Sequence, residues 1–253
     1  MTPHATTIRC LAQALPNSST EMFRFKCFDV RDERSAMKVG TDGVLLGAWA
    51  DVATDCHILD IGTGSGIIAM MVAQRNHEAQ IIGIDIDTGA TEDARENVQR
   101  TPWRERITIV QSDIACFDRS EKFDHIVSNP PYFNSSLHSP SAERTVARHT
   151  ASLDFAQLVR SACRLLRKGG RLSVILPTNE AWRFRFEAFG HLHLRRLTDV
   201  VTKEGGAPQR TLMEFQLTES TPMPRCSTLT IHNADGSYSE DYQHLTNDFY
   251  LKF

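Results

Sequence analysis

The chain has 253 residues, of which 41% are hydrophobic, and a formal net charge of -3. This length allows one large domain with a substantial core, and the composition excludes a disordered or fibrous protein. The slightly acidic balance also excludes a protein that coats nucleic acid over its whole surface, although it leaves room for a local basic patch. We therefore expect any contact with nucleic acid to be confined to one site.

The cysteines and histidines show no metal-binding pattern. Six cysteines lie at least 17 residues apart, which excludes CxxC pairs and is typical of buried, reduced thiols in a cytoplasmic protein. His191 and His193 fall in a predicted strand and are interpreted as structural, so we expect no metal. No stretch approaches the roughly 18 apolar residues of a membrane span, and residues 1–20 lack a signal-peptide pattern. We expect no membrane contact and a disordered N-terminal tail.

Short β-branched runs alternate with helical patterns from Ile58 onward, which is typical of parallel βαβ units. The pattern predicts strands at 57–61, 80–86, 106–113 and 123–128, with helices at 67–76 and 88–100. A longer helix over 153–168 is predicted to begin at the cap Ser152 and to end at Gly169 and Gly170. The basic run at 160–171 contains no acid and is interpreted as a solvated face.

The remaining segments complete one doubly wound unit. A strand at 171–177 and a helix at 179–189 precede a predicted antiparallel pair, 191–203 and 210–218. The sequence thus predicts an α/β fold with a mostly parallel, seven-stranded sheet that binds its ligand at the carboxyl ends of the strands. The predicted divisions are a tail (1–20), an N-terminal addition with a hairpin and a helix (21–56), the core (57–218) and a C-terminal appendage with a strand and a helix (219–253).

A glycine-rich loop follows the first core strand, with the pattern Asp60-x-Gly62-x-Gly64-x-Gly66. Glycines allow a tight turn and a close approach of the backbone to a ligand. The pattern departs from the dinucleotide fingerprint G-x-G-x-x-G, and the carboxylate before it would repel a pyrophosphate. The same carboxylate suits a ligand with an ammonium and a sulfonium, so S-adenosylmethionine fits the loop and NAD fits it poorly.

Acids also end the next two strands. Asp85 is expected to accept hydrogen bonds from both hydroxyls of the cofactor's ribose, and Asp113 to accept one from its adenine amine. Ile86 and Ile114 follow these acids directly and are expected to flank the adenine ring. Three acids at three successive strand ends favour a cofactor site over a loop that only packs a helix on a strand.

The fourth core strand ends in Asn129-Pro130-Pro131-Tyr132, beside the first strand in the expected strand order. Asn129 offers a side-chain oxygen and Pro130 a backbone carbonyl, and the two prolines hold both acceptors in place. Two acceptors can bind both hydrogens of an exocyclic amine and localise the lone pair that the ring otherwise delocalises. Tyr132 offers a face on which a planar base or amide can stack. The motif predicts methyl transfer to a planar nitrogen.

The glycine loop and the NPPY motif together resemble the Rossmann-like class I S-adenosylmethionine-dependent methyltransferases that act on adenine N6, guanine N2 or glutamine N5. The upstream run KVGTDGVLLGAWA (38–50) is similar to the bacterial tRNA1(Val) adenine-37 N6-methyltransferases. Three further segments are similar to the same family: TPWRERI (101–107), ERTVARHT (143–150) and YSEDYQHLTNDFYLKF (238–253). The similarity runs from about Phe23 to Phe253 and implies a single methyltransferase domain over 21–253. We also expect a cytoplasmic monomer.

The resemblance implies methyl transfer from S-adenosylmethionine to N6 of adenine 37, beside the anticodon, in a valine tRNA. It implies that Asn129, Pro130, Pro131 and Tyr132 form the catalytic loop, with Asn129 also in contact with the cofactor. The residues of the upstream run that it assigns to the cofactor are Lys38, Thr41 and Asp42, of which the last two close over the methionine end.

A polar segment, 134–150, follows the catalytic motif. Its Arg144, Arg148 and His149 are expected to meet phosphates beside a flipped base, with a merely solvated loop as the alternative. Two other activities use the same chemistry: glutamine N5-methylation of a translation factor and guanine N2-methylation of ribosomal RNA. The upstream run favours the tRNA enzyme, since the protein-modifying relatives usually have a larger helical N-terminal domain. The intact NPPY motif argues against a binding module without catalysis.

Overall fold

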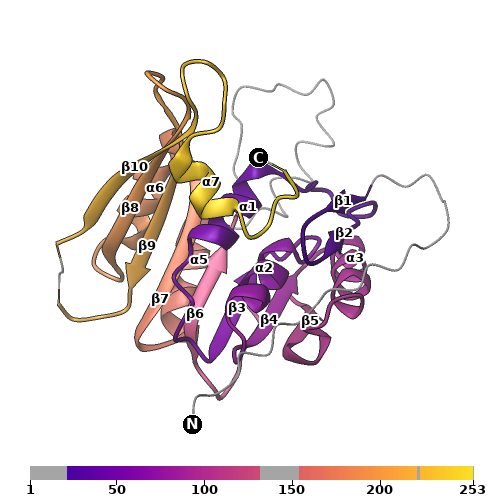
Figure 1. Cartoon of the computed structure of the whole chain (residues 1–253). Helices are drawn as coiled ribbons and strands as arrows, with labels where there is room; N and C mark the ends of the chain where they lie inside the picture. Colours follow the sequence, from indigo (N-terminus) through magenta and orange to yellow (C-terminus); the bar gives the residue numbers. More distant parts are fainter. Residues whose placement is uncertain (1–21, 132–153, 221–222, 253) are drawn as a thin grey trace, which may run out of the picture.

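The structure, a computed structural model, describes residues 22–131, 154–220 and 223–252. The predicted tail 1–20 and the predicted cap Ser152 lie outside these ranges. The described elements form a central sheet with helices on both faces (Figure 1). In chain order they are β1 (Phe23–Arg24), β2 (Asp29–Val30), α1 (Thr41–Trp49), β3 (His57–Ile61), α2 (Ile67–Arg75), β4 (Gln80–Asp85), α3 (Thr88–Gln99), η1 (Arg104–Arg106), β5 (Ile107–Gln111), β6 (Phe123–Ser128), α5 (Phe155–Leu165), β7 (Leu166–Pro177), α6 (Thr178–Ala188), β8 (His193–Lys203), β9 (Pro208–Gln216), β10 (Arg225–His232) and α7 (Glu240–Thr246).

The strand order of the large sheet is β10-β8-β9-β7-β6-β3-β4-β5. Neighbours from β7 to β5 run parallel, and β9 is antiparallel to both β7 and β8. These pairings confirm the predicted α/β class, the parallel core and the antiparallel pair. The strand of the C-terminal appendage, β10, joins the sheet in parallel beside β8, so the described sheet has eight strands where the sequence predicts seven.

Each central strand sends alternate side chains to opposite faces of the sheet, as the two-residue period of a strand requires. Ile58 and Ile81 belong to the core beneath α1 and α2, whereas Leu59 and Ile82 belong to the core beneath α5 and α6. Strands covered on both faces are almost continuously apolar, which is why these runs are recognisable in the sequence. The fold is a three-layer αβα sandwich (Figure 1).

The junction between α5 and β7 differs from the predicted helix. Asp154 caps the start of α5, and the helix ends at Leu165 instead of continuing to residue 168. β7 begins at once, and Gly169, with a φ of 81°, lies inside it where the pairing with β6 shifts register. The Gly169 N–H donates to the Leu217 carbonyl (2.7 Å). The two glycines therefore serve a strand irregularity instead of a helix end, because pairing with the chain after β9 competes with the helix.

The N-terminal hairpin and the C-terminal segment pack against each other (Figure 1). The Lys26 N–H donates to the Phe249 carbonyl (2.8 Å), and the Lys26 ammonium donates to the Asn247 carbonyl (2.6 Å). Phe25 stacks on Tyr250 with ring centroids 6.0 Å apart. α7 packs on α1 and β10. The two additions are thus joined to each other and to the core.

Three of the cysteines in the described part of the chain lie at the surface. Cys56, Cys116 and Cys226 are exposed, so the expectation of buried thiols is wrong for these three, which lie in connections or on the edge strand. Within residues 22–131, 154–220 and 223–252, no helix has the length and apolar character needed to cross a membrane. Nor do these residues contain a group of three or more His, Cys, Asp or Glu side chains arranged to hold a metal ion.

Candidate active site

Four strands end at the same edge of the sheet and bring predicted site residues together. β3, β4, β5 and β6 are parallel neighbours, with Ile61 paired to Ser128 and Asp85 to Gln111 at their carboxyl ends. The segments that follow these strands border a pocket of about 1220 Å³. The predicted residues that line it are Lys38, Thr41, Asp42, Gly62, Gly64, Asp85, Ile86, Asp113, Ile114, Asn129 and Pro131.

The glycine loop turns sharply between β3 and α2. Gly62, Gly64 and Gly66 have φ angles of 71°, 55° and 83°, a region that residues with a Cβ rarely adopt. The Gly64 N–H donates to the Asp85 carboxylate (2.9 Å), which ties the loop to the end of β4. Gly66 does not line the pocket; a Cβ on it would lie 3.3 Å from the Cβ of Ala94 in α3. This glycine therefore serves the packing of the loop on α3.

Asp60 is buried beneath the loop and does not line the pocket. Its Oδ2 accepts a hydrogen bond from the Thr63 hydroxyl (2.7 Å), and its Oδ1 has no hydrogen-bond partner among the described residues. Burial raises the pKa of Asp60 to about 7; the Thr63 hydroxyl and the Ala69 N–H oppose the rise, and the charge of Asp85 adds to it. A positive charge in the neighbouring pocket would lower this pKa and favour the carboxylate.

Asp85 ends β4 with both carboxylate oxygens facing backbone amides. They accept hydrogen bonds from the N–H groups of Gly64 (2.9 Å) and Asp87 (3.0 Å). Burial raises the pKa of Asp85, and these amides oppose the rise. Ile86, the next residue, is 55% exposed and lines the pocket. An exposed isoleucine beside a carboxylate gives this part of the pocket an apolar and a polar contact for one ligand.

Asp113 lies two residues after β5 and borders the same pocket. Its Oδ1 accepts a hydrogen bond from the Ala115 N–H (2.8 Å) and a longer one from the Gln157 amide of α5 (3.4 Å). Ile114 is buried, with part of its surface on the pocket. The turn after β5 thus holds a carboxylate and an apolar side chain side by side.

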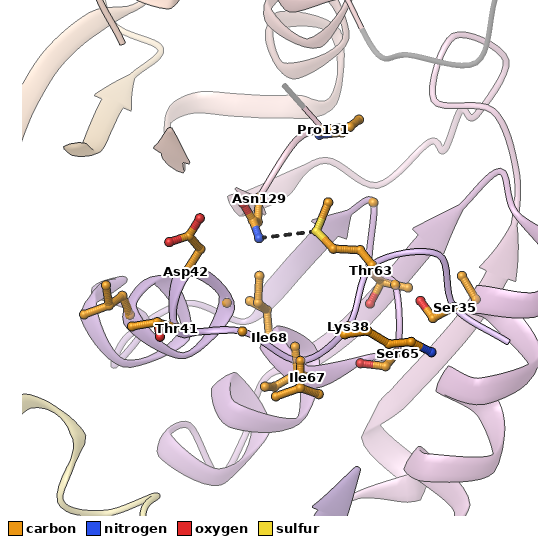
Figure 2. Close-up of a pocket in the computed structure, with 18 of the residues that line it drawn as sticks. Ser35, Lys38, Thr41, Asp42, Thr63, Ser65, Ile67, Ile68, Asn129 and Pro131 are labelled. Carbon is orange, nitrogen blue, oxygen red and sulfur yellow. Dashed lines mark hydrogen bonds between the residues drawn. The ribbon is translucent and has the colours of Figure 1, made fainter. Parts of the chain in front are cut away.

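Asn129 follows β6 and faces the pocket between Asp42 and Thr63 in the view of Figure 2. Its side-chain oxygen is buried and has no hydrogen-bond partner among the described residues. The side-chain nitrogen lies 3.9 Å from the Met37 sulfur (dashed line in Figure 2). A buried amide oxygen without a partner costs about 1–3 kcal/mol. Such a cost at a pocket is typical of a group whose partner arrives with a ligand.

The residues around Asn129 hold it in position. Ser128 is buried and donates its hydroxyl to the Ile61 carbonyl (2.8 Å), which fixes the end of β6 against β3. Pro130 is buried and does not line the pocket, whereas Pro131 is exposed and does. The remaining predicted residues, Tyr132, Arg144, Arg148 and His149, lie outside the described residues.

The segment before α1 and the first turn of α1 form another side of the pocket. The Lys38 ammonium donates to the backbone carbonyls of Asp32 and Glu33, so it is held within its own segment. The Asp42 carboxylate accepts a hydrogen bond from the Arg210 guanidinium of β9 (2.8 Å). Arg210 was not predicted as a site residue, because it lies 168 positions from its partner and no local pattern indicates the contact.

A further side of the pocket consists of residues that the sequence patterns do not indicate as site residues. We call it the aromatic wall; its members are Phe23, His232, Tyr238, Tyr242 and Tyr250. They come from β1, the end of β10, the connection that follows it, α7 and the C-terminal segment, and all of them line the same pocket. The spacing of the three tyrosines in the C-terminal segment is the one sequence signal that could have indicated them.

Comparison with known proteins identifies the family. The family model described as methyltransferase small domain matches residues 37–194. A Bacteroides thetaiotaomicron protein named tRNA1(Val) (adenine(37)-N6)-methyltransferase is 44% identical over 231 residues, which cover 90% of this chain and 97% of that protein. A Phocaeicola vulgatus protein of the same name is 48% identical over 232 residues, with the same coverage of 90% and 97%.

Solved structures support the fold. A protein from Agrobacterium tumefaciens, called a predicted O-methyltransferase, is similar with a TM-score of 0.65 at 21% identity, covering 82% of this chain and 96% of that one. At this identity the similarity concerns the fold alone. Since the family model spans more than half of the chain and both relatives match over nearly their full length, the chain belongs to the tRNA1(Val) (adenine(37)-N6)-methyltransferase family.

Proposed function

We propose that the protein transfers a methyl group from S-adenosylmethionine to N6 of adenine 37 in tRNA1(Val). Membership of the family and the methyltransferase fold support this activity. The observation that carries it is the Asn129 oxygen, which is buried without a partner and borders the same pocket as the glycine loop. An amine with two hydrogens supplies the donor that this oxygen lacks.

The acidic side of the pocket fits S-adenosylmethionine, which when bound supplies a methyl group on a positively charged sulfur. Asp60 supports this fit, because its buried oxygen lacks a partner and its raised pKa would fall beside a cation. Asp85 binds the ribose hydroxyls, and Asp113 binds the adenine amine. The residues assigned to the cofactor are Lys38, Thr41, Asp42, Asp60, Gly62, Gly64, Gly66, Asp85, Ile86, Asp113, Ile114 and Asn129.

Some of these residues act indirectly. The charged groups of Lys38 and Asp42 are already bound, to backbone carbonyls and to Arg210 respectively. They order the segment around Thr41, which closes over the methionine end of the cofactor. Asp60 and Gly66 act from behind the lining, the first through its charge and the second through the shape of the loop.

The catalytic loop prepares the substrate amine. The Asn129 side-chain oxygen and the Pro130 carbonyl accept its two hydrogens, which draws the nitrogen toward tetrahedral geometry and localises its lone pair. Pro130 and Pro131 fix the positions of the two acceptors, so little reorganisation is needed when the substrate arrives. Tyr132 stacks on the adenine ring. The extra proton leaves after the nitrogen has gained its methyl group and its positive charge.

The partner is a valine tRNA, and the enzyme acts in the cytoplasm as a monomer without a metal. Arg144, Arg148 and His149 bind phosphates that flank the target, as expected for single-stranded RNA with a base turned outward. A base turned outward is required because the pocket lies at the end of a sheet, where an adenine stacked between its neighbours could not reach Asn129.

Product identification tests the proposal. The protein is incubated with methyl-labelled S-adenosylmethionine and, separately, with tRNA1(Val), the same tRNA with guanine at position 37, ribosomal RNA and a translation factor. We expect label as N6-methyladenosine, identified by mass spectrometry of nucleosides, only in the unaltered tRNA. Label on glutamine in the protein, or as N2-methylguanosine in ribosomal RNA, would replace the proposal by one of the two other activities.

A further inference from the structure

Residues 31–40 form a segment, here called the strap, that covers one side of the pocket. They contain no helix or strand, and Ser35 alone among them is buried. The members that line the pocket are Ser35, Ala36, Met37, Lys38, Val39 and Gly40. A segment with so little buried surface needs hydrogen bonds to hold a fixed position.

Helix α3 supplies such hydrogen bonds from one of its faces. Gly89, Asp93 and Asn97 lie four residues apart, so they share one side of the helix. The Asp93 carboxylate accepts hydrogen bonds from the backbone N–H groups of Arg34 (2.8 Å) and Ser35 (2.9 Å). A Cβ on Gly89 would lie 2.9 Å from the Arg34 carbonyl oxygen, so the lack of a side chain there lets the strap approach the helix.

Asn97 joins the strap to the glycine loop. Its side-chain oxygen accepts a hydrogen bond from the Arg31 N–H (3.0 Å), and its side-chain nitrogen donates to the carbonyls of Arg31 (2.7 Å) and Ser65 (2.9 Å). The strap and the loop also meet at the pocket, since a Cβ on Gly64 would lie 3.7 Å from the Ser35 hydroxyl oxygen. Asn97 is fully buried. One buried amide thus ties two sides of the pocket to each other.

The strap also reaches Asn129. The sulfur of Met37 lies 3.9 Å from the Asn129 side-chain nitrogen (dashed line in Figure 2). A thioether sulfur is a weak acceptor, so this contact favours the amide orientation in which the nitrogen faces Met37 and the oxygen is left for a ligand. The position of the strap therefore affects both the cofactor side of the pocket and the amide.

From these contacts we infer that Asn97 and Asp93 are positioning residues for S-adenosylmethionine and for Asn129. Neither lines the pocket. From behind its lining they hold the strap against the glycine loop, so that this side of the pocket is in place before a ligand enters. A preformed side loses less conformational entropy on binding than one that the ligand must order. The inference rests on the proposed function for the identity of the cofactor.

Replacing Asn97 tests the link between strap and loop. Asn97→Ala removes all three hydrogen bonds, so the strap occupies its binding position for only part of the time, and the apparent affinity falls by that fraction. We expect the Kd for S-adenosylmethionine, measured by titration calorimetry, to rise roughly tenfold. The KM for S-adenosylmethionine should rise by the same factor, with a smaller effect on kcat, because a saturating cofactor orders the strap.

Asn76 provides a matched control for the loss of a buried amide. It is 5% exposed, does not line the pocket, and its hydrogen bonds to backbone groups measure 2.6 to 2.9 Å. Asn76→Ala should lower the stability in urea as Asn97→Ala does, yet leave the Kd for S-adenosylmethionine unchanged. Hydrogen exchange of the ligand-free proteins gives a second readout: the amides of Arg34 and Ser35 should exchange faster in Asn97→Ala and not in Asn76→Ala.

Asp93 tests the strap without a direct change at the glycine loop. Asp93→Ala removes the acceptor for the N–H groups of Arg34 and Ser35, and we expect it to raise the Kd for S-adenosylmethionine as well. Asp93→Asn keeps a side-chain oxygen that can accept from both N–H groups, so it should recover most of the affinity. This pair of variants also gives an answer if Asn97→Ala does not fold.

The outcomes distinguish the inference from the function on which it rests. If the unchanged protein does not bind S-adenosylmethionine, the proposed function fails. If it does, and Asn97→Ala and Asp93→Ala bind the cofactor as tightly, the positioning role is wrong. The role is also wrong if Asn76→Ala raises the Kd as much as Asn97→Ala does, because a general loss of stability then accounts for the effect.

Discussion

Two buried aspartates at opposite ends of β3 have opposite surroundings. Asp55, before the strand, is 5% exposed, and Asp60, near its end, is 0% exposed. Burial alone raises the pKa of both. At Asp55 the hydrogen bond from His125 and the charges of His125 and Arg171 outweigh burial, and the pKa is lowered. At Asp60 burial prevails, and the pKa rises to about 7.

The surroundings of Asp55 are complete. His125 Nδ1 lies 2.9 Å from the Asp55 carboxylate, its Nε2 lies 2.9 Å from the Ser173 hydroxyl, and Arg171 donates to both Asp55 oxygens at 2.9 Å. The hydrogen bonds link Ser173 to His125 and His125 to Asp55, which is the arrangement of a Ser-His-Asp hydrolase triad. Here, however, His125 and Ser173 are 0% exposed and do not line the pocket. This network therefore holds β3, β6 and β7 together.

The contrast between Asp55 and Asp60 distinguishes two edges of the sheet. At the amino edge, where the parallel strands begin, buried side chains stabilise the fold; at the carboxyl edge, where these strands end, they belong to the candidate site. At the amino edge, side chains of the protein itself complete the hydrogen bonds of Asp55 and His125. At the carboxyl edge, Asp60 and Asn129 each keep a buried oxygen without a partner among the described residues. A buried oxygen of this kind destabilises the ligand-free protein, and where it borders or underlies a pocket we expect a ligand to complete it.

The largest expected effect is a loss of methylation activity when a residue at the carboxyl edge is replaced. Asn129→Ala removes the unpartnered acceptor, and we expect the methylation rate at saturating substrates to fall about 10²–10³-fold, as when one preorganised hydrogen-bonding group is lost. Single-turnover kinetics measure this rate, with Asn179→Ala on the exposed side of α6 as the matched control. A rate within a factor of ten of the unchanged protein would contradict the role of the amide oxygen.

At the amino edge the effect should appear as stability. Asp55→Ala leaves the half-buried Arg171 and the buried His125 without their shared partner, and we expect the free energy of unfolding to fall by about 3–5 kcal/mol. Asp51→Ala removes a more exposed partner of the same arginine (3.4 Å) and should cost at most about 1 kcal/mol. Urea unfolding at pH 7 compares the two. Because the pKa of Asp55 is lowered by folding, its contribution should vanish as the pH falls below about 4. Equal losses in both variants would contradict this.

Asp60 should show the opposite dependence on pH. Its folded pKa of about 7 exceeds the unfolded value of 3.8, so the folded state retains a proton that the unfolded chain releases. The ligand-free protein therefore loses stability as the pH rises from about 4 to 7. We expect Asp60→Asn to be more stable than the unchanged protein at pH 8, by an amount on the order of a few kcal/mol, and nearly equal at pH 4. Urea unfolding at both values tests this, with exposed Asp248→Asn as control; a constant difference would contradict it.

Local patterns predicted the parts of the site that depend on local structure. Strand ends are visible in the sequence, and Asp85, Asp113 and Asn129 border the pocket because each lies at or just after the end of a strand. Pairings between distant segments were not visible. The sequence pattern predicts a solvated face for Arg171, yet its side chain is 18% exposed and bound to Asp55, 116 positions away. The same reason explains the place of β10 in the central sheet and the aromatic wall, which exist only after the C-terminal segment packs on the sheet.

Proton release on cofactor binding tests most directly whether the carboxyl edge is completed by a ligand. Because burial raises the pKa of Asp60 to about 7, we expect part of the ligand-free protein to hold a proton on Asp60 at pH 7, and a cation bound nearby should displace this proton. Titration calorimetry of S-adenosylmethionine in buffers with different heats of ionisation counts the protons. We expect the unchanged protein to release more protons than Asp60→Asn does, since the titration of the cofactor itself is the same in both proteins. Equal proton release from the two proteins would contradict the account.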